Sequence, residues 1–227
     1  DIQRESTVLG GAGNVASNLI SLGSHVSVIS VVGDDSNGKE LLDILYSQGA
    51  SIQGIVVQEG RKTSKKSRVI ASHQQVVRYD SESKEYITLS SEEELLERFN
   101  DALTSVDLVI LSDYGKGVLT PCVTREIIAF AKKQHIPILV DPKGVDYSKY
   151  SGATLITPNK KEASIATKIE IIDDASLQKA GYFTVESMKD VNSQKIRQDI
   201  GEVNKKYKLD LALPSVDEVE GWVKKLS

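Results

Sequence analysis

Runs of aliphatic and β-branched residues alternate with longer stretches of helical periodicity along much of the chain. The spacing of apolar positions predicts a helix over residues 14–22 that ends at Gly23. The alternation that follows predicts a buried strand over residues 25–32, then a polar loop and a second helix over residues 39–48. Strands separated by helices in this way are typical of a parallel sheet with crossover connections.

A different pattern occupies residues 50–80, where apolar positions recur at every second residue without helices between them. It predicts three strands, over residues 51–58, 66–71 and 75–79. Because these strands do not alternate with helices, we expect them to form an antiparallel flap on the main sheet.

The alternation of strands and helices resumes near residue 91. Ser91 opens a capping box, and Thr120 is a predicted N-cap followed by a proline at the first helical position. The predicted elements are a helix over 91–103, a strand over 107–111, a helix over 121–134, strands over 136–140 and 153–156, and a helix over 160–167. The chain is therefore assigned to the α/β class, with a parallel, Rossmann-like sheet and a small antiparallel flap.

Polar clusters directly follow the three later strands, at residues 113–116, 141–143 and 159–162. The carboxyl ends of parallel strands lie at one edge of a sheet, where α/β proteins bind their ligands. Asp113 and Lys116, three apart on a glycine-bounded loop, suit a hydroxyl and a phosphate oxygen, and the second cluster repeats this logic. Surface turns are the alternative for each. We expect the clusters to meet around one pocket.

The third cluster places Asn159 and Glu162 on the same side of a helix start. Such oxygen ligands suit Mg²⁺ beside nucleotide phosphates, directly or through water. An N-capping Asn159 followed by an acidic first turn is the structural alternative.

Residues 10–14 form a glycine-rich entry into the first helix, which lets a polar or anionic ligand approach the backbone closely. Residues 11–16 also fit the dinucleotide fingerprint, with Asp34 and Asp35 about 20 positions further on. A nicotinamide-dependent enzyme and a tight turn without a ligand both stay open as alternatives.

Residues 61–68 contain five basic side chains in eight positions, including Arg68. Arginine and lysine there suit a phosphate, by charge and by forked hydrogen bonds. Lysines that protect an exposed strand edge are the alternative explanation.

Composition and net charge narrow the range of possible partners and cellular compartments. The formal net charge of -4 argues against a nucleic-acid partner. Cys122 is the only cysteine, which excludes an internal disulfide and favours a reducing, cytoplasmic compartment. The apolar runs are short, and the polar start has no signal-peptide core, so we expect no membrane partner.

Taken together, the motifs resemble the ribokinase-like (PfkB) carbohydrate kinases. Residues 10–14 are similar to their sugar-binding glycine motif, and residues 159–162 to their Asn-x-x-Glu motif. More narrowly, residues 3–6, 74–78 and the stretches around the three polar clusters resemble the kinase half of the bifunctional heptose-phosphate kinase and ADP-heptose synthase. The resemblance covers about residues 1–180 and implies a three-layer ribokinase-like core.

This resemblance implies a transferase that uses ATP and Mg²⁺ to phosphorylate the anomeric hydroxyl of D-glycero-D-manno-heptose 7-phosphate, a precursor of ADP-heptose and the lipopolysaccharide core. Lys116 and Arg68 become candidates for the 7-phosphate, and Lys143 for substrate contact. Asn159 and Glu162 would organise the nucleotide phosphates and the metal. The implied substrate-binding set is Gly10, Gly11, Asn14, Arg68, Asp113, Lys116 and Lys143.

Two family features do not occur in the 227 residues: the early Gly-Asp of a first strand and the late Gly-Ala-Gly-Asp motif, whose aspartate is the catalytic base. The catalytic residue therefore stays unassigned, and impaired turnover is expected. A non-catalytic sugar-phosphate-binding protein or fragment is the alternative. We expect a kinase core over residues 1–181, a helical tail of unknown role over 182–227, and the flap over about 50–80 as a surface for a homodimer.

Overall fold

The computed structural model describes residues 3–71, 74–173, 176, 198 and 215–217. The chain divides into two compact units. Residues 1–106 and 112–127 form unit 1, and residues 107–111 and 128–227 form unit 2. The predicted helical tail lies almost entirely outside the described residues.

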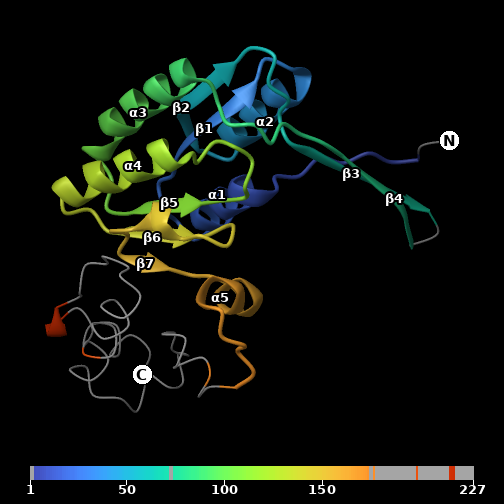
Figure 1. The fold of residues 1–227 in the computed structure, drawn as a ribbon. Helices are drawn as coiled ribbons and strands as arrows, with labels where there is room; N and C mark the ends of the chain where they lie inside the picture. Colours follow the sequence, from blue (N-terminus) through green and yellow to red (C-terminus); the bar gives the residue numbers. More distant parts are fainter. Residues whose placement is uncertain (1–2, 72–73, 174–175, 177–197, 199–214, 218–227) are drawn as a thin grey trace. The chain divides into compact units, whose positions relative to one another are not determined.

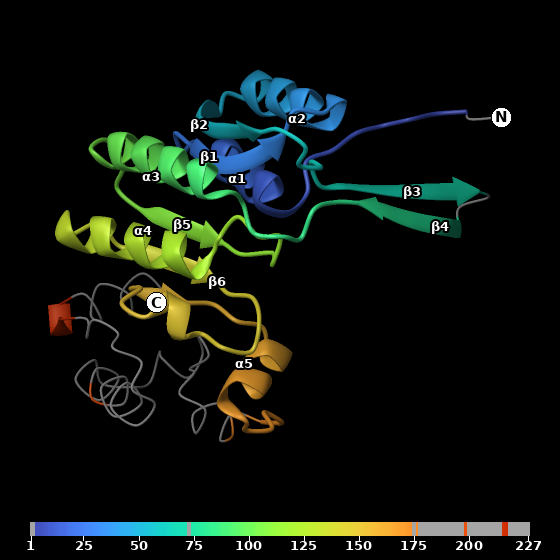
Figure 2. The same cartoon turned by 45° about the horizontal axis from the view of Figure 1, so that its top comes forward.

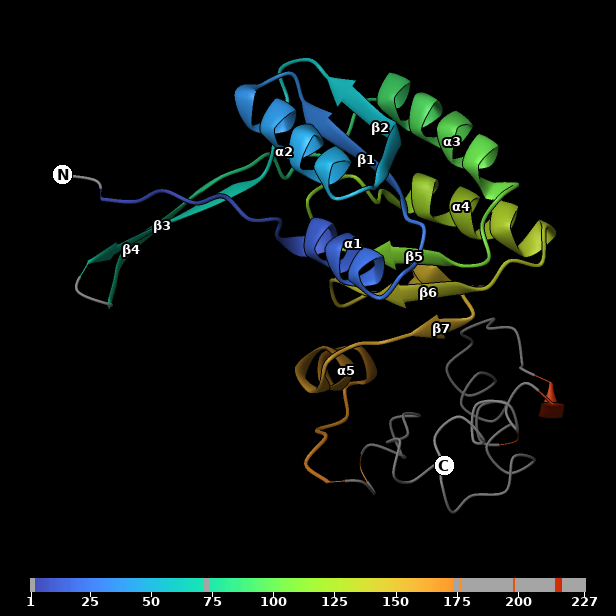
Figure 3. The same ribbon diagram turned by 180° about the vertical axis from the view of Figure 1, so that it is seen from behind.

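Unit 1 is built on two parallel strands, β1 (Ser27–Gly33) and β2 (Ser51–Gln58). Helices α2 (Ser36–Ser47) and α3 (Leu89–Leu103) pack on opposite faces of this pair (Figures 1, 2 and 3). The first helix, α1 (Gly11–Ser21), lies on the same side as α2 (Figure 3). This helix–sheet–helix layering confirms the predicted α/β architecture.

The core of unit 1 follows from the amphipathic pattern of its elements. Ala16 of α1 and Leu45 of α2 point inward, where they meet Val32 of β1 and Ile55 of β2. Leu45 is only 2% exposed, so these side chains exclude water from the space between helices and strands. Burying this apolar surface holds the layers together.

The prediction that residues 51–58 belong to the antiparallel flap is wrong. Their bounds as a strand were predicted correctly, but β2 pairs in parallel with β1, with Ser30 opposite Ile55 and Val32 opposite Val57. Ile55 and Val56 are 5% and 1% exposed, which fits a parallel strand covered by helices on its two faces. The alternation of apolar and polar residues along a strand shows which side chains share a face. It does not show which strand is the hydrogen-bonding partner.

The flap itself consists of β3 (Lys65–Ala71) and β4 (Gln74–Ser81), an antiparallel ribbon that projects from the body of unit 1 (Figure 1). Val69 lies opposite Val77, while Arg68 lies opposite Arg78. Because side chains alternate across a strand, the valines and the arginines occupy opposite faces of the ribbon.

Unit 2 contains a three-stranded sheet in the order β5 (Val109–Ser112), β6 (Ile138–Asp141) and β7 (Leu155–Ile156). Strands β6 and β7 are parallel, and α5 (Lys160–Thr167) follows the last strand. Strands that are consecutive in the chain are therefore neighbours in this sheet.

Between β5 and β6 runs α4 (Pro121–Lys133), and Thr120 accepts a hydrogen bond from the Val123 N–H at 3.1 Å, as predicted for its N-cap. No helix in the part of the chain that the structure describes has the length and apolarity of a membrane span.

Three helices begin one turn or less before their predicted starts, among them α1, which begins at Gly11 rather than at residue 14. Asp35 caps α2 by accepting a hydrogen bond from Gly38 N–H at 2.8 Å, so the helix includes part of the predicted loop. Thr88 caps α3 through Ser91 N–H at 3.2 Å, which displaces Ser91 from the cap to the third helical position. Several neighbouring polar residues can serve as the N-cap, and sequence spacing alone did not identify which one caps each helix.

Gly117 generates a stability prediction. It has φ +78°, and a Cβ built there would lie 2.0 Å from the carbonyl oxygen of Glu85. We expect Gly117→Ala to cost about 4 kcal/mol or more of unfolding free energy, because strain and collision add. The control Gly60→Ala has φ +71° in open space and should cost only about 1–2 kcal/mol. If urea unfolding shows the same loss of unfolding free energy for Gly117→Ala and Gly60→Ala, the predicted collision at Gly117 is contradicted.

Candidate functional site

The glycine-rich turn at the start of α1 approaches the loop after β5 within unit 1. Gly10 is the extended N-cap of α1, and Gly11 has φ +52°. A Cβ on Gly11 would lie 3.4 Å from the ring of Tyr114, so the turn packs beside that ring. Gly10 and Asn14 are exposed and accessible to a ligand. The structure thus brings the glycine-rich motif at residues 10–14 next to the polar cluster at residues 113–116.

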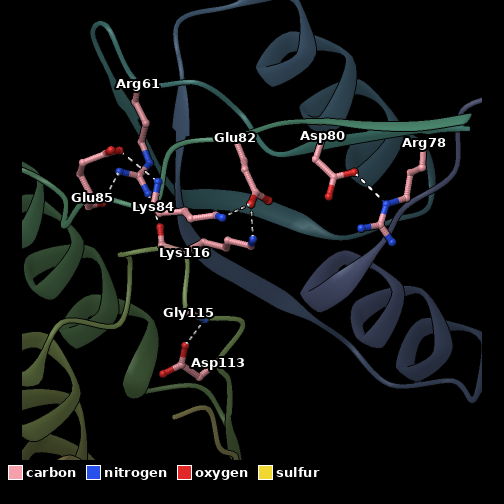
Figure 4. A network of polar contacts seen from close by, with 9 residues as sticks. All are labelled: Arg61, Arg78, Asp80, Glu82, Lys84, Glu85, Asp113, Gly115 and Lys116. Carbon is pink, nitrogen blue, oxygen red and sulfur yellow. Dashed lines mark hydrogen bonds and ion pairs between the residues drawn. The ribbon is translucent and has the colours of Figure 1, made fainter.

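The loop after β5 holds its two candidate residues in different ways (Figure 4). Asp113 is 5% exposed, and its carboxylate accepts a hydrogen bond from Gly115 N–H at 2.7 Å. Lys116 is partly exposed, and its ammonium donates to Glu82 Oε1 at 2.5 Å. The Asp113 carboxylate thus shapes the loop itself. The Lys116 ammonium is oriented by Glu82, which lies outside the loop.

Glu82, just after the flap, was not anticipated from the sequence. Its side chain is 9% exposed, and Oε1 also lies 3.4 Å from Lys84 Nζ. The bond from Lys116 holds the pKa of Glu82 below its usual range. Oε2 is buried and has no hydrogen-bond partner among the described atoms. A polar run of residues 81–84 gives no signal that one of them is buried.

Arg61 is a structural residue rather than part of a phosphate cluster. It is 7% exposed and donates to the carbonyl oxygens of Lys116 at 2.5 Å and Glu85 at 3.2 Å (Figure 4). Burial lowers its pKa, although a guanidinium remains charged. Together with the Ile87 N–H bond to Gly117 O at 3.1 Å, these contacts join the segment after the flap to the loop after β5.

The basic run at residues 61–68 does not act as one anion cluster. Arg61 is occupied by backbone carbonyls, and Lys65 pairs with Glu40 at 3.3 Å. Arg68 is exposed on β3, directly opposite Arg78. The structure thus gives separate partners to Arg61 and Lys65 of the basic run, and Arg68 remains an exposed candidate for a phosphate.

The dinucleotide alternative fails on the geometry of unit 1. Residues 3–10 are described and none of them is in a strand, whereas the fingerprint requires a strand before its glycines. Asp35 is used in folding: it caps α2 and accepts from Thr63 N–H at 2.9 Å. Because the Asp35 carboxylate is occupied by these main-chain hydrogen bonds, it is not available to bind the hydroxyls of a ribose.

Unit 2 joins the second and third polar clusters directly. The ammonium of Lys143 lies 2.9 Å from Glu162 Oε1, and the Asn159 N–H donates to Glu162 Oε2 at 3.1 Å. Asn159 Oδ1 in turn accepts from the Glu162 N–H at 3.0 Å, which completes a capping box. The bond from Lys143 holds the pKa of Glu162 below its usual range. The N-capping alternative for Asn159 is therefore confirmed.

The donor set around α5 fits a metal held through water. Each oxygen of Glu162 accepts one hydrogen bond, and a carboxylate has about four acceptor sites, so lone pairs remain for a metal-bound water. Over the described residues, no group of three or more His, Cys, Asp or Glu side chains could hold a metal. Mg²⁺ commonly keeps several waters and binds through one or two carboxylates plus phosphate oxygens.

Each unit gathers its own predicted residues. Gly11, Asp113 and Lys116 belong to unit 1, while Lys143 and Glu162 belong to unit 2. A pocket that is common to all three polar clusters stays a prediction.

Comparison with known proteins identifies the class. The family model of the pfkB carbohydrate kinases matches residues 2–191, and the chain belongs to this family. It is 57% identical over 180 residues to the bifunctional protein HldE of Sulfurimonas denitrificans, and 56% identical over 180 residues to that of Wolinella succinogenes. These alignments cover 79% of this chain and 38% of each relative, so the chain spans well under half of their length.

Solved structures support the fold. The tetrameric inhibited form of phosphofructokinase-2 from Escherichia coli matches with a TM-score of 0.60 and 21% identity, over 80% of this chain and 62% of that chain. Ribokinase from Arabidopsis thaliana, complexed with ribose and ATP, matches with a TM-score of 0.56 and 15% identity, over 88% of this chain and 57% of that chain. The predicted ribokinase-like fold is confirmed.

Glu82 generates a pH prediction. Because its folded pKa is lowered, its ion pair stabilises the protein above the ordinary glutamate pKa of 4.5, and this stability is lost as the pH falls through the folded value. We expect Glu82→Gln to lower the urea midpoint at pH 7 but to lose less stability than the wild type between pH 5 and pH 3. Glu93→Gln, exposed on α3, is the control. If the difference in urea midpoint between the wild type and Glu82→Gln is the same at all these pH values, the ion pair does not stabilise the protein as proposed.

Proposed function

We propose that the chain carries the sugar-kinase chemistry of its family, the ATP-dependent phosphorylation of D-glycero-D-manno-heptose 7-phosphate at the anomeric hydroxyl. The observation that carries this proposal is the 57% identity to a bifunctional HldE protein over 180 residues. The motif resemblance to the heptose-phosphate kinases supports the choice of sugar.

Unit 1 supplies the groups proposed to bind the phosphosugar. The exposed main chain of Gly10, the partly exposed main chain of Gly11 and the side chain of Asn14 suit hydroxyls. An ammonium has three donors, and Lys116 uses one of them on Glu82, which leaves two for a phosphate. Arg68 would add a forked contact from the flap, while Asp113 shapes the loop that carries Lys116.

Unit 2 supplies Asn159 and Glu162, which we propose for the nucleotide phosphates, and Lys143, which we propose for a phosphate of the phosphosugar or of the nucleotide. Lys143 Nζ lies at the first turn of α5, where backbone N–H groups and the helix dipole also favour anions. Asn159 and Glu162 would hold Mg²⁺ through water, and the ion would neutralise charge on the transferred phosphoryl group.

Phosphoryl transfer depends on positioning and on charge stabilisation, with a base that orients the nucleophile. The 227 residues contain no Gly-Ala-Gly-Asp run, and no residue is assigned as that base. A missing base costs about 10²- to 10⁴-fold in rate, so equilibrium binding tests the proposal more directly than turnover.

The test is calorimetric binding of heptose 7-phosphate and of MgATP to the 227-residue chain. We expect the double variant Lys116→Met with Glu82→Gln, which leaves no buried charge unpaired, to bind heptose 7-phosphate about 10- to 100-fold more weakly and MgATP as the wild type does. Lys132→Met, exposed on α4, is the matched control.

Three outcomes of that titration separate the candidates. Binding of both ligands, with the loss confined to the phosphosugar, supports the kinase. Binding of the phosphosugar without MgATP would favour a non-catalytic sugar-phosphate-binding protein. Binding of neither ligand by the wild type would refute the proposed function.

We also propose that the flap pairs two copies of the chain. Val69, Val77 and Tyr79 are 46%, 47% and 60% exposed and share one face of the ribbon, and an isolated two-stranded ribbon is marginally stable. Sedimentation should show a dimer that Val77→Lys dissociates, whereas Val76→Lys, on the other face, should leave it intact. A wild type that is monomeric at all concentrations would refute this.

A further inference from the structure

One buried tyrosine holds the loop that carries Lys143. Tyr150 ends the 3₁₀ turn at Ser148–Tyr150 and is 1% exposed. Its hydroxyl accepts a hydrogen bond from the Lys143 N–H at 3.0 Å and lies 3.3 Å from the Lys143 carbonyl oxygen, to which it donates. A single phenol therefore satisfies both main-chain polar groups of this lysine.

The tyrosine ring is itself held in place by its neighbours. The ring of Tyr147 packs edge-on at a centroid distance of 5.9 Å, and the ammonium of Lys149 lies 4.9 Å from the centroid of the Tyr150 ring. Aromatic pairs of this geometry and cations over a ring are both favourable. The hydroxyl thus projects from a side chain with little freedom to move.

The backbone next to Lys143 has intrinsic conformational freedom. Lys143 is followed by Gly144, which has φ +99° and open space around its Cα. Glycine has more conformational freedom than any other residue. The Lys143 side chain is 52% exposed, so packing alone does not fix its direction.

A continuous chain of polar contacts then leads from the phenol to α5. Tyr150 holds the backbone of Lys143, Lys143 Nζ bonds to Glu162 Oε1 at 2.9 Å, and Glu162 Oε2 accepts from Asn159 N–H at 3.1 Å. A shift of the Lys143 backbone would change the place of its ammonium relative to the first turn of α5.

We propose that Tyr150 is a positioning residue for Lys143, and that it presents the ammonium to a phosphate group bound at the first turn of α5. The phosphate belongs to MgATP or to the phosphosugar, and the inference rests on the proposed function. Pre-organising a cation before binding reduces the conformational entropy that binding must overcome. In this proposal Tyr150 touches no ligand and acts on the phosphate through Lys143.

The test is a double-mutant cycle of Tyr150→Phe and Lys143→Met, with Tyr46→Phe, 73% exposed on α2, as control. Calorimetry would measure the Kd of MgATP and of heptose 7-phosphate for each variant, and urea unfolding the stability. We expect Tyr150→Phe to weaken one of the two ligands about tenfold, the ligand that Lys143→Met also weakens. That ligand identifies the source of the phosphate.

Two comparisons separate positioning from a general structural role. In the Lys143→Met background, Tyr150→Phe should change the Kd less than twofold, while its effect on the urea midpoint should be the same in both backgrounds. A tenfold change in Kd in both backgrounds would overturn the proposal, as would no change in the wild-type background when Lys143→Met weakens binding.

A ligand-independent measurement covers the case in which the wild type binds neither ligand and the proposed function fails. Acylation of Lys143 by acetic anhydride, followed by mass spectrometry against Lys132, should be several-fold faster in Tyr150→Phe than in the wild type, because the ammonium is then less firmly held. Equal rates would overturn the positioning role by themselves.

Discussion

Glu162 holds two groups at once, the ammonium of Lys143 at 2.9 Å and the main-chain N–H of Asn159 at 3.1 Å. These contacts tie a loop after β6 to the start of α5, although the residues are 19 positions apart in the chain. The carboxylate therefore fixes the beginning of the helix and the place of a cation together. The proposed nucleotide chemistry depends on this shared constraint, because a phosphate needs both the helix N-terminus and a positioned lysine.

Unit 1 solves a similar problem with buried charge. Arg61 and Glu82 are both largely removed from water, and each is stabilised by contacts to Lys116: its carbonyl oxygen accepts from Arg61 and its ammonium donates to Glu82. Buried charges are tolerated when they are paired or hydrogen-bonded. Removing one partner would leave the other charge buried and uncompensated, which is unfavourable. We therefore expect the loop after β5 and the segment after the flap to be stabilised or destabilised together.

The sequence predicted the elements of this fold better than their partners. Helix α5 and strand β2 have the predicted bounds, because capping residues and two-residue alternation are local signals. The pairing of β2 with β1 was missed, since a strand's pattern does not identify the neighbour that hydrogen-bonds to it. The family resemblance identified the class of protein, which local patterns alone do not identify, and the family match confirms that class.

The candidate site was predictable only where chemistry and spacing coincide. Asn159 and Glu162 were found because a capping box has a fixed spacing. Glu82 and Tyr150 were missed because their roles arise from burial and from contacts over sequence distance, and a polar run or an isolated tyrosine carries no such signal. Arg61 was counted with the basic run for the same reason: its charge was visible in the sequence, but its burial was not.

The most direct test of the account is the ratio of ATP affinities with and without Mg²⁺, measured by calorimetry on the wild type and on Glu162→Gln. If Glu162 organises the ion through water beside the phosphates, Mg²⁺ should strengthen ATP binding about tenfold or more in the wild type, and the ratio should fall towards one in the variant. The same ratio in both proteins would contradict a role for the Asn159–Glu162 turn in holding a metal-bound nucleotide.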